Sequence, residues 1–206
     1  MIKIFTFLLL STTWLISDDN PNARGLVDDY TQLKYKVAMA TRASEPPLID
    51  GHIDDTAWGA AAVINEFYQF EPFNLEAPSV QTDVRVLFDD KYLYVSFYNH
   101  DAEPDKIMGR LARRDDWETG FGFNADWIGI GIDANNDDKT GYWFALNAAE
   151  VQIDVTIAGD GHGAYDGTWN AVWDGKVTLH ENGWSAEIRI PFSVFQYPRG
   201  TIQEWG

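Results

Sequence analysis

An acidic segment in the middle of the chain carries oxygen-bearing side chains at a spacing that suits a hard cation. Asp133, Asn135 and Asp137 alternate with other residues, as the oxygen donors of calcium loops do. The segment is not an EF-hand, because Asp138 replaces the glycine expected at the sixth position and Phe144 replaces the glutamate expected at the twelfth. Two interpretations stay open: a structural calcium site at these three residues, or a plain hairpin loop rich in Asp and Asn.

Four tryptophans are candidates for a platform on which a sugar could stack, because the C–H faces of a sugar ring pack well against an indole. They are Trp117, Trp143, Trp169 and Trp173. The alternative for each of them is packing in the core. Trp169 and Trp173 lie four residues apart, so on a regular strand they share one face, and that face could be the core face. Sugar binding predicts exposed ring faces, whereas core packing predicts buried ones.

Polar side chains near these tryptophans could orient a bound sugar. Arg113 and Arg114 carry guanidinium groups, whose N–H donors can hold vicinal hydroxyls or a carboxylate. Alternatively, these arginines form salt bridges with nearby aspartates, namely Asp115, Asp116 or Asp126. Asn147 and Gln152 complete the candidate ligand-binding set, because they lie on neighbouring predicted strands.

Paired carboxylates such as Glu150 and Asp154 could flank a glycosidic bond, since glycosidases need two acids at a defined separation. However, a chain with 32 acidic residues contains many such pairs by chance. No Ser-His-Asp ordering, His-Glu-x-x-His motif or phosphate-binding loop is evident, and the chain has only 4 histidines. A glycoside hydrolase is therefore the least favoured function.

The composition indicates a folded and strongly acidic domain. At 206 residues, with 45% apolar and 15% aromatic side chains, the chain has enough apolar surface for one packed core. Its formal net charge of -17 disfavours nucleic acid and anionic membrane surfaces as partners, and suits a neutral or cationic ligand. The absence of cysteine excludes disulfides, zinc–thiolate sites and thiol nucleophiles.

The N-terminus has the features of an export signal. Lys3 precedes an almost unbroken apolar run over residues 4–16, and Ser17 is a small residue at which cleavage could occur. The run is too short to span a bilayer comfortably, and the alternative is a buried N-terminal strand or helix. We expect a signal peptide over residues 1–17 and a linker with a first strand over residues 18–45. The mature protein would be periplasmic, at the cell surface or in the outer membrane.

The elements that must position these side chains are β-strands. Runs of β-branched and aromatic residues recur at short spacing, separated by turn residues such as Asp-Asp-Lys and Glu-Asn-Gly. The strands are expected at residues 33–40, 82–88, 92–99, 127–132, 142–147, 151–157, 169–179 and 184–190. With no βαβ alternation and no long amphipathic helix, this pattern predicts an all-β fold, an antiparallel β-sandwich of the jelly-roll kind.

The predicted strand over residues 151–157 has two different faces. Val and Ile occupy the odd positions, and Gln152, Asp154 and Thr156 occupy the even ones. We expect the apolar face to pack on the core of the sandwich. The polar face, together with the neighbouring strand over residues 142–147, would then form part of a ligand-facing surface.

Several motifs resemble carbohydrate-binding module family 9-like domains. Residues 49–58 read I-D-G-H-I-D-D-T-A-W, similar to the opening I-D-G-x-x-D-D-x-A-W of that family, and residues 183–191 read G-W-S-A-E-I-R-I-P, similar to its later strand. Leu-Tyr-Val after an Asp-Asp turn fits the same pattern, and the resemblance covers about residues 46–206. It implies a monomeric β-sandwich that binds polysaccharide, with Trp58 and Trp184 in the core. Related modules also bind calcium structurally.

A closer similarity is to exported proteins in which such a module precedes a C-terminal domain regarded as an outer-membrane barrel. It is carried by the Arg-Arg-Asp run at residues 113–115 and by residues 141–147 and 169–173. The chain ends inside what resembles a further strand, so we expect a fragment of a longer protein. One departure is the segment Ala148-Ala149-Glu150, where a proline and a glycine are expected, so the turn there could differ from that of the family.

The sequence therefore predicts a non-catalytic module of a larger exported protein that stacks sugar rings on tryptophan and orients them through Arg, Asp and Asn. The alternative is a structural domain that docks on its own C-terminal barrel and binds no sugar. Burial of all four candidate tryptophans would favour this alternative.

Overall fold

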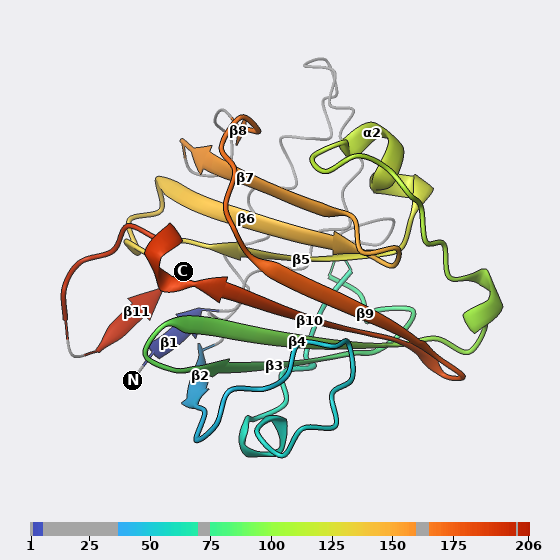
Figure 1. Cartoon of the computed structure of the whole chain (residues 1–206), viewed down its shortest axis with the longest axis horizontal. Helices are drawn as coiled ribbons and strands as arrows, with labels where there is room; N and C mark the ends of the chain where they lie inside the picture. The colour runs from blue at the N-terminus through green and yellow to red at the C-terminus, as the bar shows by residue number, and fades with distance from the viewer. Residues whose placement is uncertain (1, 6–36, 70–74, 160–164, 201) are drawn as a thin grey trace.

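The computed structural model describes residues 2–5, 37–69, 75–159, 165–200 and 202–206. These residues form two β-sheets that pack face to face, with only short helical segments between strands (Figure 1). The larger sheet has the strand order β11-β1-β2-β3-β4-β10-β9, and the smaller sheet has the order β5-β6-β7-β8. The prediction of an all-β sandwich is confirmed.

The larger sheet contains β1 (Ile2–Phe5), β2 (Val37–Arg42), β3 (Thr82–Phe88), β4 (Tyr92–His100), β9 (Asp174–His180), β10 (Gly183–Pro191) and β11 (Gln203–Trp205). The smaller sheet contains β5 (Trp127–Ile132), β6 (Thr140–Asn147), β7 (Gln152–Ala158) and β8 (Tyr165–Asp166). The helical segments are η2 (Trp58–Ala60), η3 (Pro104–Lys106), α2 (Trp117–Gly120), η4 (Gly122–Asn124) and η5 (Phe192–Val194). Strand pairs are antiparallel except β1 with β11 and β2 with β3. None of the helices in the described part of the chain is long and apolar enough to cross a membrane.

The observed strands include the short β8 and β11, which the list of predicted strands lacks, and they differ from the prediction at two further places. Residues 169–173, predicted to begin a strand, form an irregular run before β9, because the N–H of Ala171 bonds a buried aspartate side chain instead of a neighbouring strand. At the N-terminus, residues 2–5 form β1 between β2 and β11, while residues 6–17 of the predicted signal peptide lie outside the described residues. Export therefore stays a prediction.

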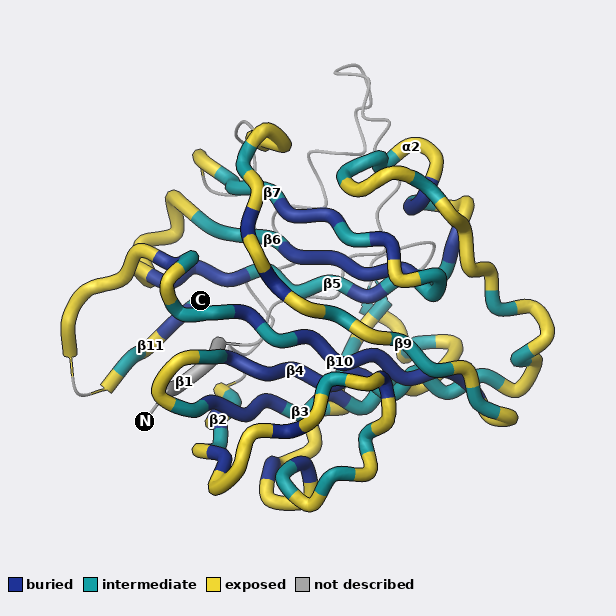
Figure 2. Tube along the Cα trace, viewed as in Figure 1, coloured by how far each residue is buried: buried dark blue, intermediate teal, exposed yellow. Residues whose placement is uncertain are grey.

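The main core lies between the two sheets, and β4 and β10 are dark blue along most of their length in Figure 2. These central strands are buried on both faces because a second layer covers the outer face of the larger sheet. That layer is the segment over residues 43–61, whose Trp58 and Ala61 pack on Leu87 and Tyr94. Trp58 and Trp184 are 1% and 4% exposed, which confirms the prediction that both are core residues.

Residues 49–58 and 183–191, the two motifs that resemble the family, meet at one buried carboxylate, that of Glu187 on β10. Trp58 Nε1 donates to Glu187 Oε1 at 2.7 Å, and the backbone N–H groups of Asp50 and Gly51 donate to Oε2 at 3.0 and 2.8 Å. Burial raises the pKa of Glu187, and these three donors oppose that rise. Glycine is required at position 51, because φ is +90° and a Cβ there would lie 2.7 Å from Thr178 Oγ1.

Asp89 closes the predicted turn between β3 and β4. Its Oδ1 accepts from the N–H groups of Lys91 and Tyr92 at 2.7 and 2.8 Å, and its Oδ2 accepts from the Tyr94 hydroxyl at 2.7 Å. Burial acts to raise the pKa of Asp89, but these hydrogen bonds outweigh it and hold the pKa below the ordinary value. The ionised form therefore stabilises the hairpin.

We expect Asp89→Asn to lower the free energy of unfolding by about 1 kcal/mol at neutral pH, since an amide offers the turn one acceptor instead of two and the site is partly screened by solvent. Because the pKa of Asp89 is lowered on folding, its contribution is present above the unfolded value of about 4 and is lost as the pH falls through the folded value. The melting temperatures of the wild type and the variant should therefore converge below about pH 4. Asp90→Asn, at an exposed position of the same turn, is the control. A gap that persists unchanged in acid would contradict this assignment.

Candidate functional site

The outer face of the smaller sheet carries a tryptophan cluster formed by Trp117, Phe121, Trp127 and Trp143. Ring centroids lie 5.3 Å apart for Trp117 and Trp127, 5.6 Å for Trp117 and Trp143, and 5.7 Å for Trp127 and Trp143. Gly129 makes room for the β6 indole, because a Cβ there would lie 3.0 Å from Trp143 Nε1. The cluster is thus built by α2 folding over β5 and β6.

Part of the tryptophan cluster faces solvent. Trp117, Trp127 and Trp143 are half-buried, and the neighbouring Phe123 is 75% exposed. Trp127 Nε1 donates to the carbonyl of Gly122 at 3.3 Å, whereas the ring N–H groups of Trp117 and Trp143 have no hydrogen-bond partner among the described residues. The cluster therefore offers apolar ring surface together with free donors, the combination that a sugar unit requires.

The other two candidate tryptophans pack on the opposite face of the smaller sheet. Both contact Phe144, with ring centroids 5.9 Å from Trp169 and 5.6 Å from Trp173. Trp173 is 5% exposed and donates its Nε1 proton to Asp154 at 3.2 Å, so it is a core residue and its assignment to a sugar platform is wrong. Trp169 is half-buried against Tyr142 and keeps part of its ring at the surface.

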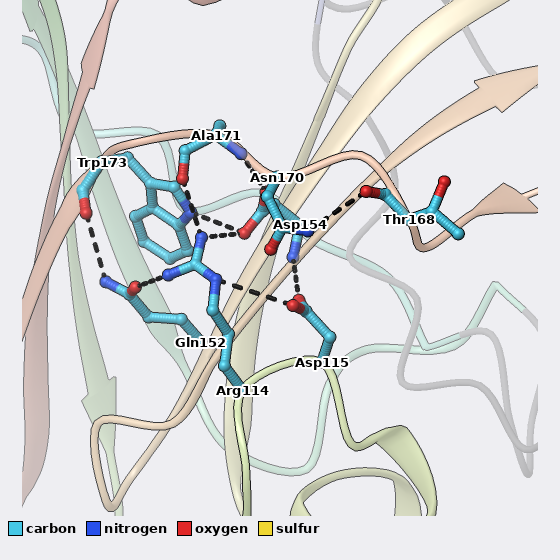
Figure 3. Close-up of polar contacts among 8 residues, drawn as sticks. All are labelled: Arg114, Asp115, Gln152, Asp154, Thr168, Asn170, Ala171 and Trp173. Carbon is cyan, nitrogen blue, oxygen red and sulfur yellow. Dashed lines mark hydrogen bonds and ion pairs between the residues drawn. The ribbon is translucent and has the colours of Figure 1, made fainter.

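Arg114 lies at the centre of a polar network that joins three segments of the chain (Figure 3). Its guanidinium donates to Gln152 Oε1, to Asp154 Oδ1 and, at 2.9 Å, to the carbonyl of Ala171. Asp115 lies 3.6 Å from Arg114 Nε, and burial raises the pKa of Asp115. The salt-bridge alternative for Arg114 is thus correct for Asp115, and a second ion-pair partner, Asp154, was not predicted from the sequence.

Asp154 is the fully buried centre of this network. Besides Arg114, it accepts from the N–H of Ala171 at 2.5 Å and from Trp173 Nε1 at 3.2 Å. The register places Asp154 opposite Phe144, a residue of the main core. The polar face of β7 therefore points into the sandwich, and the prediction that it forms a ligand-facing surface is wrong at this position.

Because the polar face of β7 points into the sandwich, its apolar face lies on the outside of the smaller sheet. Val151 and Ile153 are buried with Phe121 in a separate cluster on the outer face, beneath α2. Strand alternation correctly separated the two faces, but it could not show that a short helix covers the outer one.

The two amide candidates also have structural partners. Asn147 is fully buried: its Nδ2 donates to the carbonyls of Arg110 and Gly120 at 2.7 Å each, and its Oδ1 accepts from the N–H groups of Ala149 and Val151 at 2.9 Å each. Its hydrogen-bonding capacity is therefore filled, and its assignment to ligand binding is wrong. Gln152 is half-buried, and its Nε2 lies 3.4 Å from the carbonyl of Trp173.

Arg113 differs from its neighbour Arg114. Its side chain is exposed and forms no ion pair or hydrogen bond with any described residue. It is therefore the arginine of the pair whose donors are free to meet a ligand. It precedes α2, the helix that contributes Trp117 and Phe121 to the tryptophan cluster.

The acidic loop uses its first carboxylate, that of Asp133, to hold its own backbone. Asp133 is 6% exposed and accepts from the backbone N–H groups of Asn135, Asp137 and Asp138 at 3.0, 2.7 and 2.8 Å. These hydrogen bonds occupy lone pairs on both oxygens of Asp133 and are those of an ordinary Asp-rich turn. Within the described part of the chain, no group of three or more His, Cys, Asp or Glu side chains could hold a metal. Calcium binding by the protein stays a prediction.

Comparison with known proteins identifies the family. Residues 49–203 match the model of the carbohydrate family 9 binding domain-like family. The chain belongs to this family. No curated protein matches it in sequence.

Two solved structures of a carbohydrate-binding module family 9 from Caldicellulosiruptor kristjanssonii resemble this family member in fold. The complex with cellotriose has a TM-score of 0.52 at 19% identity and covers 82% of this chain and 73% of its own. The complex with glucose has a TM-score of 0.50 at 18% identity and covers 81% of this chain and 75% of its own.

Sequence reasoning missed two members of the tryptophan cluster, Phe121 and Trp127. Trp127 begins β5 and contacts both Trp117 and Trp143, yet it was considered only as part of a strand. The predicted antiparallel pairing of residues 127–132 with residues 142–147 could have revealed Trp127, because it places two tryptophans on one face of the sheet. Trp127 and Trp143 occupy odd positions of two paired strands, and in the observed register they lie on the same face of the sheet.

Proposed function

We propose that this protein binds oligosaccharides or polysaccharides without cleaving them. The observation that carries the proposal is membership of the carbohydrate family 9 binding domain-like family over residues 49–203. It is supported by the two fold-similar modules, which hold cellotriose and glucose in their structures.

The tryptophan cluster is the surface that fits this function best. A sugar ring laid on Trp143 or Trp117 would cover apolar ring surface that water now contacts, and burial of such surface contributes about 25 cal/mol per Å². The indole N–H groups of Trp117 and Trp143 and the guanidinium of Arg113, which have no partner among the described residues, would then donate to hydroxyls and fix the orientation of the ring. Trp169, on the opposite face of the sheet, is the competing platform.

The geometry gives no support to hydrolysis by the acid pair considered above. Asp154 is fully buried and bonded to three donors, and Glu150 forms an ion pair with Lys176 at 2.7 Å while accepting from the N–H of Val177. Neither carboxylate is placed to protonate a leaving group or to activate water. The module's place in a larger exported protein rests on the sequence resemblance alone.

A matched pair of substitutions tests the platform. We expect Trp143→Ala to weaken binding of cellotriose about tenfold or more, because it removes one stacking face, and we expect Trp169→Ala to leave the affinity within about twofold. Isothermal titration calorimetry with cellotriose, and affinity electrophoresis in gels that contain soluble polysaccharide, measure both. Circular dichroism should show that each variant is folded.

The two tryptophans serve as controls for each other, because both are half-buried and each substitution removes the same number of atoms. Weakening by Trp169→Ala alone would move the platform to the opposite face. Failure of the wild-type protein to bind any sugar or polysaccharide in a broad screen would contradict the proposed function itself.

A further inference from the structure

A cleft of about 520 Å³ lies on the outer face of the larger sheet, on the side of the sandwich away from the tryptophan cluster. Its volume falls within the range of roughly 300–1,000 Å³ typical of small-molecule sites. One wall is the turn that includes η2, and the other wall is formed by β3 and β4. The residues that line it are Ile53, Asp54, Asp55, Thr56, Trp58, Gly59, Asp83, Arg85, Tyr98 and His100.

Both walls of the cleft are firmly held. Strand alternation places Asp83 and Arg85 of β3 on the face opposite the core residues Val84 and Val86, and the register places Asp83 beside Tyr98 of β4. The other wall is fixed because Trp58 packs in the second layer and donates to the buried carboxylate described above. A ligand would therefore meet a preformed site and would not need to order one.

Hydrogen-bonding capacity in this cleft is only partly used. Asp83 accepts from Asn65 Nδ2 at 3.2 Å and lies 3.1 Å from His100 Nε2, so this part of the wall is paired. In contrast, neither Arg85 nor Asp54 has an ion pair or side-chain hydrogen bond with a described residue, although both line the same cleft. The Arg85 guanidinium on one wall and the Asp54 carboxylate on the other therefore keep donors and acceptors that a ligand between them could use.

The charges of the residues that line the cleft indicate which class of ligand it can bind. Three carboxylates, those of Asp54, Asp55 and Asp83, outnumber the single guanidinium of Arg85, so the cleft disfavours anions such as phosphates and uronic acids. A divalent cation is disfavoured by Arg85. A neutral sugar unit satisfies both sides, since its vicinal hydroxyls accept from a guanidinium fork and donate to carboxylates.

We propose that this cleft is a second carbohydrate-binding site, with Arg85 and Asp54 as the residues that hold sugar hydroxyls. The inference rests on the proposed function, and it adds a second and independent point of attachment. Because the two sites lie on opposite outer faces of the sandwich, one module would bridge two glycan chains or two segments of one chain. Binding to a polysaccharide would then gain from avidity, whereas binding to a single glucose would not.

Nuclear magnetic resonance of the indole N–H groups separates the two sites. Titrating ¹⁵N-labelled protein with glucose, and then with cellotriose, should shift the Trp58 signal at the cleft and the Trp143 signal at the tryptophan cluster, with separate saturation curves. Arg85→Met should weaken the titration seen at Trp58 about tenfold and leave that at Trp143 unchanged. Arg113→Met, at an arginine of the other surface that pairs with none of the described residues, is the matched control and should leave the Trp58 titration unchanged.

Each outcome decides between the two sites. Saturable shifts at Trp58 that Arg85→Met weakens support the second site, and a smaller loss in Arg85→Lys would show that the fork matters as well as the charge. Shifts confined to the tryptophan cluster and insensitive to Arg85→Met overturn the second site and leave the proposed function intact. Absence of any shift at high concentrations of glucose and cellotriose overturns both. Thermal melting of each variant verifies that it is folded.

Discussion

Replacing Glu187 with glutamine should lower the free energy of unfolding by about 2 kcal/mol, and replacing it with alanine should lower it by about 3–4 kcal/mol. In the glutamine variant, one side-chain oxygen can still accept from the N–H groups of Asp50 and Gly51, but the amide nitrogen then faces Trp58 Nε1, and two donors cannot bond. Alanine leaves all three buried donors without a partner and also opens a cavity, because Glu187 is fully buried.

Urea denaturation followed by tryptophan fluorescence measures this effect, and Glu181→Gln, at an exposed residue of the β9–β10 turn, is the control. Trp58→Phe should reproduce the loss of that one hydrogen bond. In the double variant Trp58→Phe with Glu187→Gln, the two losses should be less than additive, because both remove the same bond. Additive losses would show that the bond between the two motifs contributes little, and that packing alone holds the second layer on the sheet.

Much of the fold could be predicted from local sequence patterns. The hairpin of β3 and β4 and the meander that begins with β5 alternate clearly and are separated by turn residues, so their bounds follow from side-chain period. What alternation cannot show is which layer covers each face. The apolar face of β7 packs under α2 and its polar face points into the sandwich, because Asp154 finds its partners in segments distant in sequence.

The candidate site was less predictable than the fold for a related reason. Whether a tryptophan or an amide is exposed depends on contacts made after the sheets have packed. Trp173 and Asn147 are buried by segments remote from them in sequence, whereas Trp143 keeps part of its ring at the surface. The cleft beside Arg85 was missed because polar residues at alternate positions of β3 and β4 look like an ordinary solvent-facing side until the turn containing Trp58 folds over them.

Asp154→Ala should lower the free energy of unfolding by about 3 kcal/mol. Most of this loss comes from two buried donors, the N–H of Ala171 and Trp173 Nε1, which would have no other acceptor. The ion pair with Arg114 contributes less, because the side chain of Arg114 is 35% exposed and solvent screens its charge. Urea denaturation measures the change, with Asp105→Asn at an exposed site as the control. A loss below about 1 kcal/mol would contradict the role of Asp154 as the centre of the network.

The same network predicts that replacing Arg114 mainly lowers stability, whereas replacing Arg113 mainly lowers sugar affinity. Arg114→Met should destabilise the fold by about 1–2 kcal/mol, because it removes donors from Gln152 and Asp154, yet it should leave the affinity for cellotriose within about twofold. Arg113→Met should leave the free energy of unfolding nearly unchanged and weaken binding of cellotriose, because the Arg113 side chain bonds none of the described residues and only its donors to a ligand are lost. If Arg114→Met instead abolished binding in a variant that remains folded, Arg114 would belong to the ligand site. The network in Figure 3 would then have to open when sugar binds.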